Sequence, residues 1–442
     1  MDRTKKEDSV FTAELVLGQN EAMMSRQRLA WVIVLTGFTC FVILLVTIPF
    51  LLNIVLQNAR RDLVVSVQAN QGTLGIEDAD GLFSALRAND PPTTIAAGTT
   101  LLTSSSDTAL VQVFDVDGVT MLERAEVYGN SSVQVATADR PRFSVSSARA
   151  QLILTVNSGR VRLVVPPLES DDVPVVRIET PHGYALVTEP GTFSIQVVNE
   201  ETQVTVQSGA VALIRDPETL NVSAEQRAMI LLDGSISGPL AAERNLVHNG
   251  DFTEGEGGLA QWTPLAWQVE RDDQSAGQIT VREVNGQPSL RVERVGVGAA
   301  EVQVRQIIDA DITGYEYLQL VVSMRILNQS LAVCGTVGSE CPLTIEFEFE
   351  DQDGQRRFWR QGFYASGEIG PGTLDVCQFC SPPLNVHERV SQGQLAFYDS
   401  GNILDMLSQN GIQARTIYSL TLESAGHSFE VEIVEVALIA KE

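Results

Sequence analysis

One uncharged stretch, Leu29 to Leu52, constrains this 442-residue chain more than any other feature. Sixteen of its 24 residues are Leu, Ile, Val or Phe. An α-helix needs about 20 apolar residues to cross the hydrocarbon core of a bilayer. The stretch is too long for the apolar region of a cleaved signal peptide, which has about 7 to 15 residues. We therefore predict an uncleaved anchor, a transmembrane helix over residues 29–56.

The charges on either side of this stretch predict its orientation. Five basic residues precede the stretch, whereas the nearest basic residues after it are Arg60 and Arg61. Because basic flanks stay on the cytoplasmic side, the tail 1–28 is predicted to be cytoplasmic. The protein then crosses the cell membrane once, with its C-terminal region extracytoplasmic. The tail balances five acidic against five basic residues, so the formal net charge of −26 falls on the outer region. This negative charge argues against nucleic acid as a partner, because phosphate groups are attracted by basic surfaces and repelled by acidic ones.

Beyond the anchor, the sequence predicts an all-β extracytoplasmic region. Over residues 57–94, apolar and polar residues alternate little, and Pro91 and Pro92 stand near the end of the stretch. This pattern favours a stalk with one short helix around Ala79–Leu86. From Ile95 onward, short runs rich in Val, Ile and Thr alternate with polar residues, as in half-buried strands. The predicted turns between them lie at Asp117-Gly118, Gly129-Asn130, Ser158-Gly159, Pro190-Gly191 and Ser208-Gly209.

The order of strands and turn residues over residues 95–234 resembles a known family. The matching pieces are Asp117-Gly118, Gly159–Leu163, Thr180–Gly183, Gly191–Phe193 and Gly209–Val211. They are similar to the FecR-type domain, the extracytoplasmic part of bacterial ferric-citrate regulators. The resemblance implies a β domain in a bacterial envelope and, as an alternative function, transmembrane signalling. Transmembrane members of that family carry an anti-sigma helical domain before the span, and the short tail departs from that pattern.

Residues 235–244 have the composition of a linker, and a second domain is predicted over residues 245–442. Its opening, Asn245–Phe252 followed by Trp262, is similar to the carbohydrate-binding jelly rolls of the galactose-binding-like class. The regular spacing of the later strands is typical of a two-sheet sandwich. The resemblance implies a non-catalytic module for a glycan or a partner protein.

Two kinds of site follow from this second resemblance. Jelly rolls of the class often hold a structural calcium ion where the opening and closing segments meet, and the matching positions are Asn249, Asp251 and Glu435. A solvated acid beside a turn is the alternative. Glycan binding needs aromatic rings, and the candidate contacts are Tyr398 and Trp267, since Trp262 and Trp359 stand where a core ring is expected.

Four of the five cysteines, Cys334, Cys341, Cys377 and Cys380, lie in the last quarter of the chain. An exported location favours disulfides, whose pairing the sequence does not choose, and a four-thiolate zinc site is the alternative.

For catalysis the sequence offers little. The four histidines are scattered along the sequence and form no motif with the spacing of a catalytic site. His182 is expected to be a turn residue. Glu346, Glu348 and Glu350 alternate along one strand and predict a solvated edge. We therefore expect a membrane-anchored bacterial envelope protein that is not an enzyme and displays a binding or sensing module. A FecR-type signalling regulator and a purely structural envelope protein are the alternatives.

Overall fold

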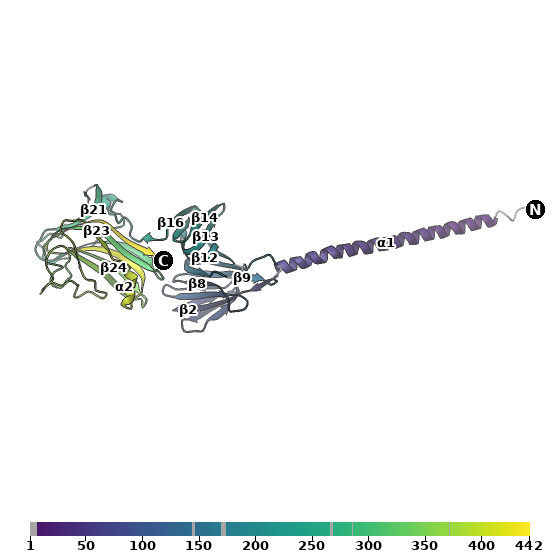
Figure 1. Cartoon of the computed structure of the whole chain (residues 1–442), viewed down its shortest axis with the longest axis horizontal. Coiled ribbons are helices and arrows are strands. Elements are labelled where there is room, and N and C mark those ends of the chain that lie inside the picture. The colour runs from purple at the N-terminus through teal and green to yellow at the C-terminus, as the bar shows by residue number, and fades with distance from the viewer. Residues whose placement is uncertain (1–6, 144–145, 169–173, 266–267, 285, 371) are drawn as a thin grey trace, which may run out of the picture.

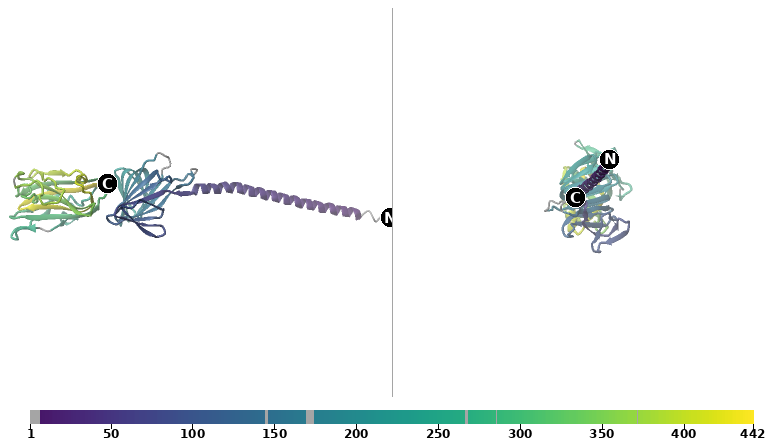
Figure 2. Two further views of the ribbon diagram at one scale, coloured as in Figure 1. Left: turned by 90° about the horizontal axis from the view of Figure 1, so that it is seen from below. Right: turned by 90° about the vertical axis from the view of Figure 1, so that its right-hand side faces the viewer.

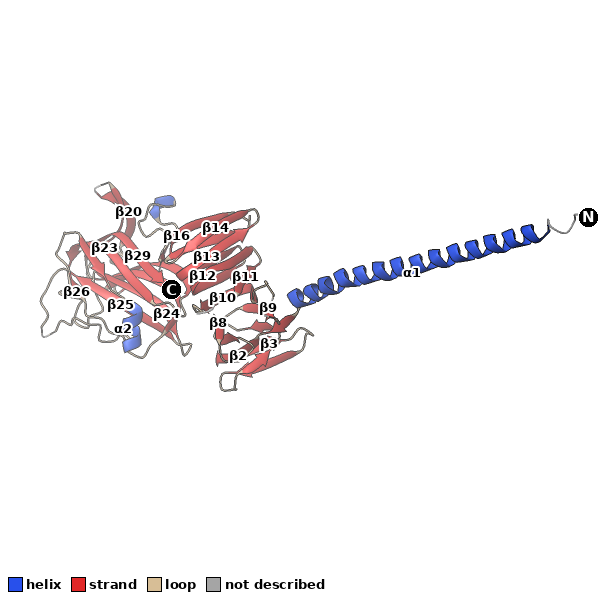
Figure 3. Ribbon diagram, turned by 45° about the vertical axis from the view of Figure 1, so that its right-hand side comes forward, coloured by secondary structure: helices blue, strands red, loops and turns tan. Residues whose placement is uncertain are grey.

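The structure, a computed structural model, describes residues 7–143, 146–168, 174–265, 268–284, 286–370 and 372–442. A long N-terminal helix is followed by two β domains in a row (Figure 1, Figure 2). Beyond the first helix, the described regular structure is almost all strand (Figure 3). The exceptions among the described residues are the helix α2 (Ile403–Gln409) and the 3-10 turn η1 (Glu256–Gly258). The predicted fold class, an all-β region behind one apolar helix, is confirmed.

The first helix, α1 (Glu7–Asn58), begins well before the predicted span and ends close to the predicted end. Its segment Arg28–Asn58 is long and apolar enough to cross a membrane, and none of the most apolar part is buried in the protein. Side chains such as Phe41 and Leu45 are more than half exposed. An apolar surface of this extent is unusual on a soluble protein and marks contact with a membrane or another apolar partner.

The predicted stalk at residues 57–94 is wrong, because strands of the first β domain begin directly after α1. The N–H of Ala59 still donates to Val55 O in the helix, and Ala59 O accepts from the N–H of Arg142 in the domain. The predicted helix at Ala79–Leu86 is also wrong, since a strand begins at Phe83. The strands of this domain are β1 (Arg60–Asp62), β2 (Val64–Gln71), β3 (Thr73–Glu77), β4 (Phe83–Arg87), β5 (Thr93–Ile95), β6 (Thr100–Leu102), β7 (Thr108–Phe114), β8 (Met121–Val127), β9 (Ser132–Pro141), β10 (Gln151–Val165), β11 (Val175–Thr180), β12 (Gly183–Val198), β13 (Glu201–Arg215), β14 (Glu218–Ser223), β15 (Gln226–Leu231) and β16 (Ile236–Ala241).

These sixteen strands form one extended sheet that bends round a common core. Three of the predicted turns lie inside long strands instead, at Ser158-Gly159 in β10, Pro190-Gly191 in β12 and Ser208-Gly209 in β13. Gly159 shows why. Its φ of +87° and its approach to Ser131 suit only glycine. Before Gly159, β10 pairs with β9, and after it with β8 and β12. The glycine therefore lets one strand change partners without reversing direction.

The core of the first domain is mostly aliphatic, and it contains one carboxyl group that is almost fully buried. Inward side chains of β2, β7, β10 and β13, mostly Val and Leu, form a single cluster. Glu123 on β8 is 1% exposed, and neither of its oxygens has a hydrogen-bond partner among the described residues. Burial raises the pKa of this carboxyl to about 8. Glu123 is therefore mostly neutral at physiological pH.

The second β domain is a sandwich of two sheets in which most neighbouring strands are antiparallel. The first sheet contains β17 (Arg244–Asn245), β20 (Gln278–Val284), β21 (Gln287–Arg294), β23 (Tyr317–Gln329), β27 (Ala396–Asp399) and β29 (Phe429–Lys441). The second contains β18 (Thr263–Pro264), β19 (Gln268–Val269), β22 (Ala300–Asp311), β24 (Leu343–Asp351), β25 (Arg356–Tyr364), β26 (Glu388–Arg389) and β28 (Ala414–Gly426). The predicted linker, 235–244, is mostly strand, because β16 pairs with β15 and β17 pairs with β29.

Aromatic rings fill the space between the two sheets. Trp359 is fully buried and stacks on Phe347, with 5.2 Å between ring centroids. Trp262 lies 5.7 Å from Phe252 and donates its indole N–H to Asn249 O at 2.9 Å. Both tryptophans are core residues, as their sequence context predicts.

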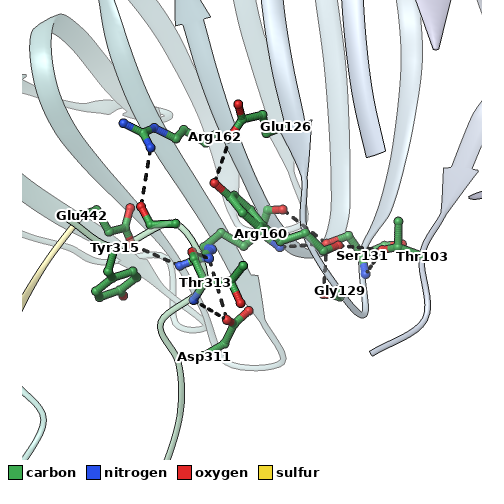
Figure 4. A network of polar contacts seen from close by, with 12 residues as sticks. Thr103, Glu126, Gly129, Ser131, Arg160, Arg162, Asp311, Thr313, Tyr315 and Glu442 are labelled. Carbon is green, nitrogen blue, oxygen red and sulfur yellow. Dashed lines mark hydrogen bonds and ion pairs between the residues drawn. The ribbon is translucent and has the colours of Figure 1, made fainter. Parts of the chain in front are cut away.

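The two β domains contact each other through a buried arginine (Figure 4). The side chain of Arg160, on β10, is 5% exposed, and its guanidinium lies 4.1 Å from the ring centroid of Tyr128 in the same domain. The same guanidinium donates to Thr313 O in the second domain and lies 3.8 Å from Asp311 and from the Glu442 side chain. Lys441 with Glu225, and Arg162 with Glu316, form further ion pairs across the junction. The domains therefore pack as neighbours with few residues between them.

Candidate functional site

A cleft of about 760 Å³ opens on the outer face of the second sheet of the sandwich. Strand alternation builds it. On β22, Val302 and Val304 point into the core, so Glu301 and Gln303 point outward into the cleft. Alternate residues of β24, β25 and β28 reach the same face, including Thr344. The cleft therefore has a polar lining on a rigid sheet.

Three carboxyl groups from three neighbouring strands meet in this cleft. Glu301 lies on β22, Glu346 on β24 and Glu423 on β28. Gln303 bridges two of them, because its amide donates to Glu301 and to Glu423 Oε2, the latter at 2.9 Å. Burial, followed by the charges of Glu301 and Glu346, raises the pKa of Glu423 to about 8. Burial also raises the pKa of Glu301.

The predicted solvated edge at Glu346 is wrong, because β24 lies between β28 and β25 in the sheet. Glu346 is 8% exposed and accepts a hydrogen bond from Arg360 of β25. Its neighbours on the same face are also paired. Glu348 bonds Arg356 at 2.5 Å, and Glu350 accepts from the hydroxyl of Tyr418 at 2.6 Å.

The cysteines lie at one end of the cleft as two local pairs. The sulfurs of Cys334 and Cys341 are 1.97 Å apart, and those of Cys377 and Cys380 are 1.95 Å apart. The disulfide interpretation thus fits the structure. The thiolates that the zinc alternative requires are absent from this arrangement. The ring of His387 lies beside the first pair, with its nearest nitrogen within 4.8 Å of both sulfurs.

His387 is a buried member of the cleft wall. Its Nε2 lies 2.8 Å from Gly338 O, and since a carbonyl only accepts, Nε2 carries the proton. Nδ1 then holds a lone pair, and it has no partner among the described residues. Burial lowers the pKa of His387, which keeps the ring neutral. A side chain at Gly362, on the floor of the cleft, would meet Nδ1 at 2.4 Å, so glycine leaves room for the ring of His387 at this point.

The candidate aromatic contacts fall elsewhere. Tyr398 lies on β27 of the other sheet, packs edge-on against Phe363 at 4.9 Å and donates its hydroxyl to Gln361 at 3.1 Å. Trp267 lies outside the described residues. An aromatic residue near the described lining in the sequence is Phe379, which stands between Cys377 and Cys380 of the lining and is 78% exposed. A lone aromatic inside a Cys-x2-Cys loop is the signal that sequence reasoning passed over.

The expected calcium ligands are only partly brought together. The opening and closing segments do meet, because the N–H of Val436 donates to Gly250 O at 2.9 Å. However, the Asn249 side chain bridges its own loop, donating to Glu254 O, Gly258 O and Ala260 O and accepting from the Glu254 N–H. Asp251 and Glu435 are both exposed. This donor set does not make a closed cage for a hard cation, and a calcium site stays a prediction.

No family model and no curated protein matches the chain. Solved structures that are similar include an anti-sigma factor from Parabacteroides distasonis, at 14% identity and a TM-score of 0.23. That likeness covers 31% of this chain and 57% of the other, so the chain spans little more than half of that protein's length.

Carbohydrate-binding modules are also among the similar structures. The family 11 module from Clostridium thermocellum, in complex with a β-1,3-1,4-mixed-linked tetrasaccharide, is 9% identical, with a TM-score of 0.25, and 44% of this chain covers 94% of it. The CBM22-1 xylan-binding domain from Paenibacillus barcinonensis is 10% identical, with a TM-score of 0.24, and 45% of this chain covers 96% of it. Sequence identities and TM-scores this low do not define a function for the chain.

Proposed function

We propose that the protein is a membrane-anchored, non-catalytic display module whose second β domain binds a glycan in the cleft over Glu301, Glu346 and Glu423. The single observation that carries this proposal is the cleft itself. It is a polar depression of about 760 Å³ on an outward sheet face, and the exposed Phe379 lies in the sequence between two cysteines that line it.

The lining suits a polar, extended ligand better than an apolar one. Carboxylates, an amide, hydroxyl groups and one guanidinium face the cleft and offer directional hydrogen bonds. Saccharides present many hydroxyl groups and flat apolar ring faces, which stack on aromatic side chains. Phe379 supplies such a ring between two residues of the lining, so both kinds of contact are available to one sugar chain.

The test is retention of the full-length protein, in detergent micelles, on insoluble polysaccharides and on peptidoglycan. Phe379→Ala and Thr344→Arg are the two cleft variants, the second placing a long side chain in the floor. The matched control is Phe397→Ala, which removes an equally exposed ring (75%) from β27 in the other sheet. We expect both cleft variants to lose most of the retention and the control to keep it. Equal retention of all four proteins would refute the proposal.

Absence of catalysis is tested in the same samples. Glycoside hydrolysis needs a pair of carboxyl groups across the scissile bond, and in the cleft Glu346 is tied to Arg360. We expect no new reducing ends after long incubation with any polysaccharide that the protein retains. Release of reducing ends that is lost in Glu423→Gln would make the protein a glycosidase instead.

The membrane part of the proposal rests on α1. The exposed apolar surface of Arg28–Asn58 is the observation that supports it. Basic residues before the span favour a cytoplasmic N-terminus. We expect the protein to stay in the membrane pellet after alkaline extraction and protease added outside intact cells to degrade the β domains. Release by alkali would show that the helix does not anchor the chain.

Transmembrane signalling is a second candidate, because α1 joins the first β domain without a stalk. Gln57, near the end of the helix, accepts a hydrogen bond from Ser147 N at 2.9 Å, and its carbonyl accepts from the Ser146 hydroxyl at 3.1 Å. A displacement of the domain would thus reach the helix directly. Signalling predicts that a bound glycan changes the protease sensitivity of residues 7–28, whereas simple display predicts no change.

A further inference from the structure

The cleft has a strong imbalance of charge. Its lining includes the carboxyl groups of Glu270, Glu301, Glu340, Glu346 and Glu423 and the single guanidinium of Arg360. Arg360 donates to Glu346, so its charge is already paired. The described part of the lining therefore holds several carboxyl groups for which it supplies no cation.

Among its described side chains, the cleft has few free hydrogen-bond donors beside the hydroxyl groups of Ser339 and Thr344. The amide N–H groups of Gln303 are directed to Glu301 and Glu423. The ring of His387 adds no free donor, because Nε2 is bonded to Gly338 O and Nδ1 is buried against Gly362. The carboxylates can only accept when they are ionised. A ligand that fits this lining has to bring both positive charge and donors.

Burial makes this arrangement costly in the free protein. The high pKa of Glu423, with Glu301 and Gln303 beside it on β22 and Glu346 on β24, shows that these carboxyl groups resist being charged together. A cation placed among them would remove that repulsion in a site of lowered dielectric. A neutral sugar hydroxyl would not.

We propose that the ligand of the cleft is a saccharide with free primary amines, whose ammonium group lies among Glu301, Glu346 and Glu423. This inference rests on the proposed glycan-binding function and specifies its substrate class. An ammonium group carries one positive charge and three donors, which matches three neighbouring acceptors. Charge-assisted hydrogen bonds of this kind are about twice as strong as neutral ones.

The test compares four soluble probes by calorimetric titration of the full-length protein in detergent micelles. They are a β-1,4-linked glucosamine pentamer, its N-acetylated form, the corresponding glucose pentamer, and pentalysine. We expect the glucosamine pentamer to bind about tenfold or more tightly than either neutral pentamer, the order of one charge-assisted hydrogen bond. Binding should also release protons, because the ammonium group lowers the pKa of Glu423, and the measured heat should then differ between buffers of different ionisation enthalpy.

Three variants locate the effect. Glu301→Gln and Glu423→Gln should reduce the preference for the amine and the proton release. Glu283→Gln, an exposed acid on β20 of the other sheet, should leave both unchanged. Equal binding of the three pentamers would overturn this inference and leave the proposed function standing. No binding of any saccharide would overturn both, and pentalysine binding as tightly as the glucosamine pentamer would show a general cation site instead.

Discussion

Arg160 and Tyr315 belong to different β domains, and the guanidinium of Arg160 lies 5.2 Å from the ring centroid of Tyr315 (Figure 4). Tyr128 covers the same guanidinium from within the first domain, and burial raises the pKa of its hydroxyl to about 12. A buried arginine between two rings, with acids from the second domain beside it, loses most of its interactions if the domains separate.

We predict that Arg160→Ala uncouples the two domains. Removing one partner of a buried charged network costs about 3 kcal/mol or more, and here that free energy stabilises the junction. Calorimetric unfolding of the full-length protein should change from one coupled transition to two, the second domain melting apart from the first. Arg177→Ala is the matched control, because Arg177 stacks on Tyr184 at 4.0 Å inside the first domain alone. If both variants unfold alike, the interface does not couple the domains.

The buried carboxyl group of Glu123 should make the free energy of unfolding depend on pH in an unusual way. Its pKa, about 8 in the folded protein, lies well above the ordinary value of 4.5. Below pH 4.5 both states hold the proton. Between pH 4.5 and 8 the unfolded chain loses it while the folded protein keeps it, so stability falls with rising pH, in total by on the order of 4 kcal/mol.

The replacement Glu123→Gln should remove this dependence. Chemical denaturation should give nearly equal stabilities for the variant and the wild type at pH 4, and a more stable variant at pH 8. Glu77→Gln, an exposed acid on β3 of the same domain, should follow the wild type at both pH values. A variant that is less stable at pH 8 would mean that the Glu123 carboxylate has a partner in solution.

The sequence predicts the elements whose signal is local. The apolar length of α1 and the alternation in β7 and β24 are visible in short windows. The stalk was mispredicted because the eight residues of β2 alternate only briefly, and their partner β7 begins some 40 residues later. Glycines inside β10, β12 and β13 were interpreted as turns, since a glycine that bends a strand and one that reverses the chain look the same in sequence.

The cleft could not be assembled from the sequence for a related reason. Glu301, Glu346 and Glu423 lie far apart along the chain and become neighbours only through the pairing of β22, β28 and β24. Strand alternation predicts that each points outward, but not which strands lie side by side. The disulfide pairs, by contrast, are local, and Phe379 stands between two of the cysteines in the sequence.

Asn249 is predicted to stabilise the protein independently of any metal. Its side chain makes four hydrogen bonds within one loop, and its φ of +49° is one that Asn tolerates better than most residues. Asn249→Ala should therefore lower the free energy of unfolding by about 2 kcal/mol or more, even in the presence of a chelator. Asp251→Asn, at an exposed acid in the same segment, is the control.

The same two variants test the calcium prediction. If calcium binds between the opening segment and β29, chelation should lower the melting temperature of the wild type, and Asp251→Asn should abolish that shift. A melting temperature that chelator and added calcium both leave unchanged would remove the calcium site from consideration.

The two disulfides are predicted to have different roles. Cys334 and Cys341 are fully buried beside His387, whereas Cys377 and Cys380 flank the exposed Phe379. Closing loops this short contributes roughly 2 kcal/mol to stability. Replacing Cys334 and Cys341 by Ala should cost at least this much, because it also leaves a cavity in the buried cluster. Replacing Cys377 and Cys380 should lower the stability less and the glycan retention more, since it frees the loop that carries Phe379 between two residues of the cleft lining. Peptide mapping without reduction should recover both local pairs; a peptide linking residue 334 or 341 to residue 377 or 380 would contradict the pairing and with it this division of roles.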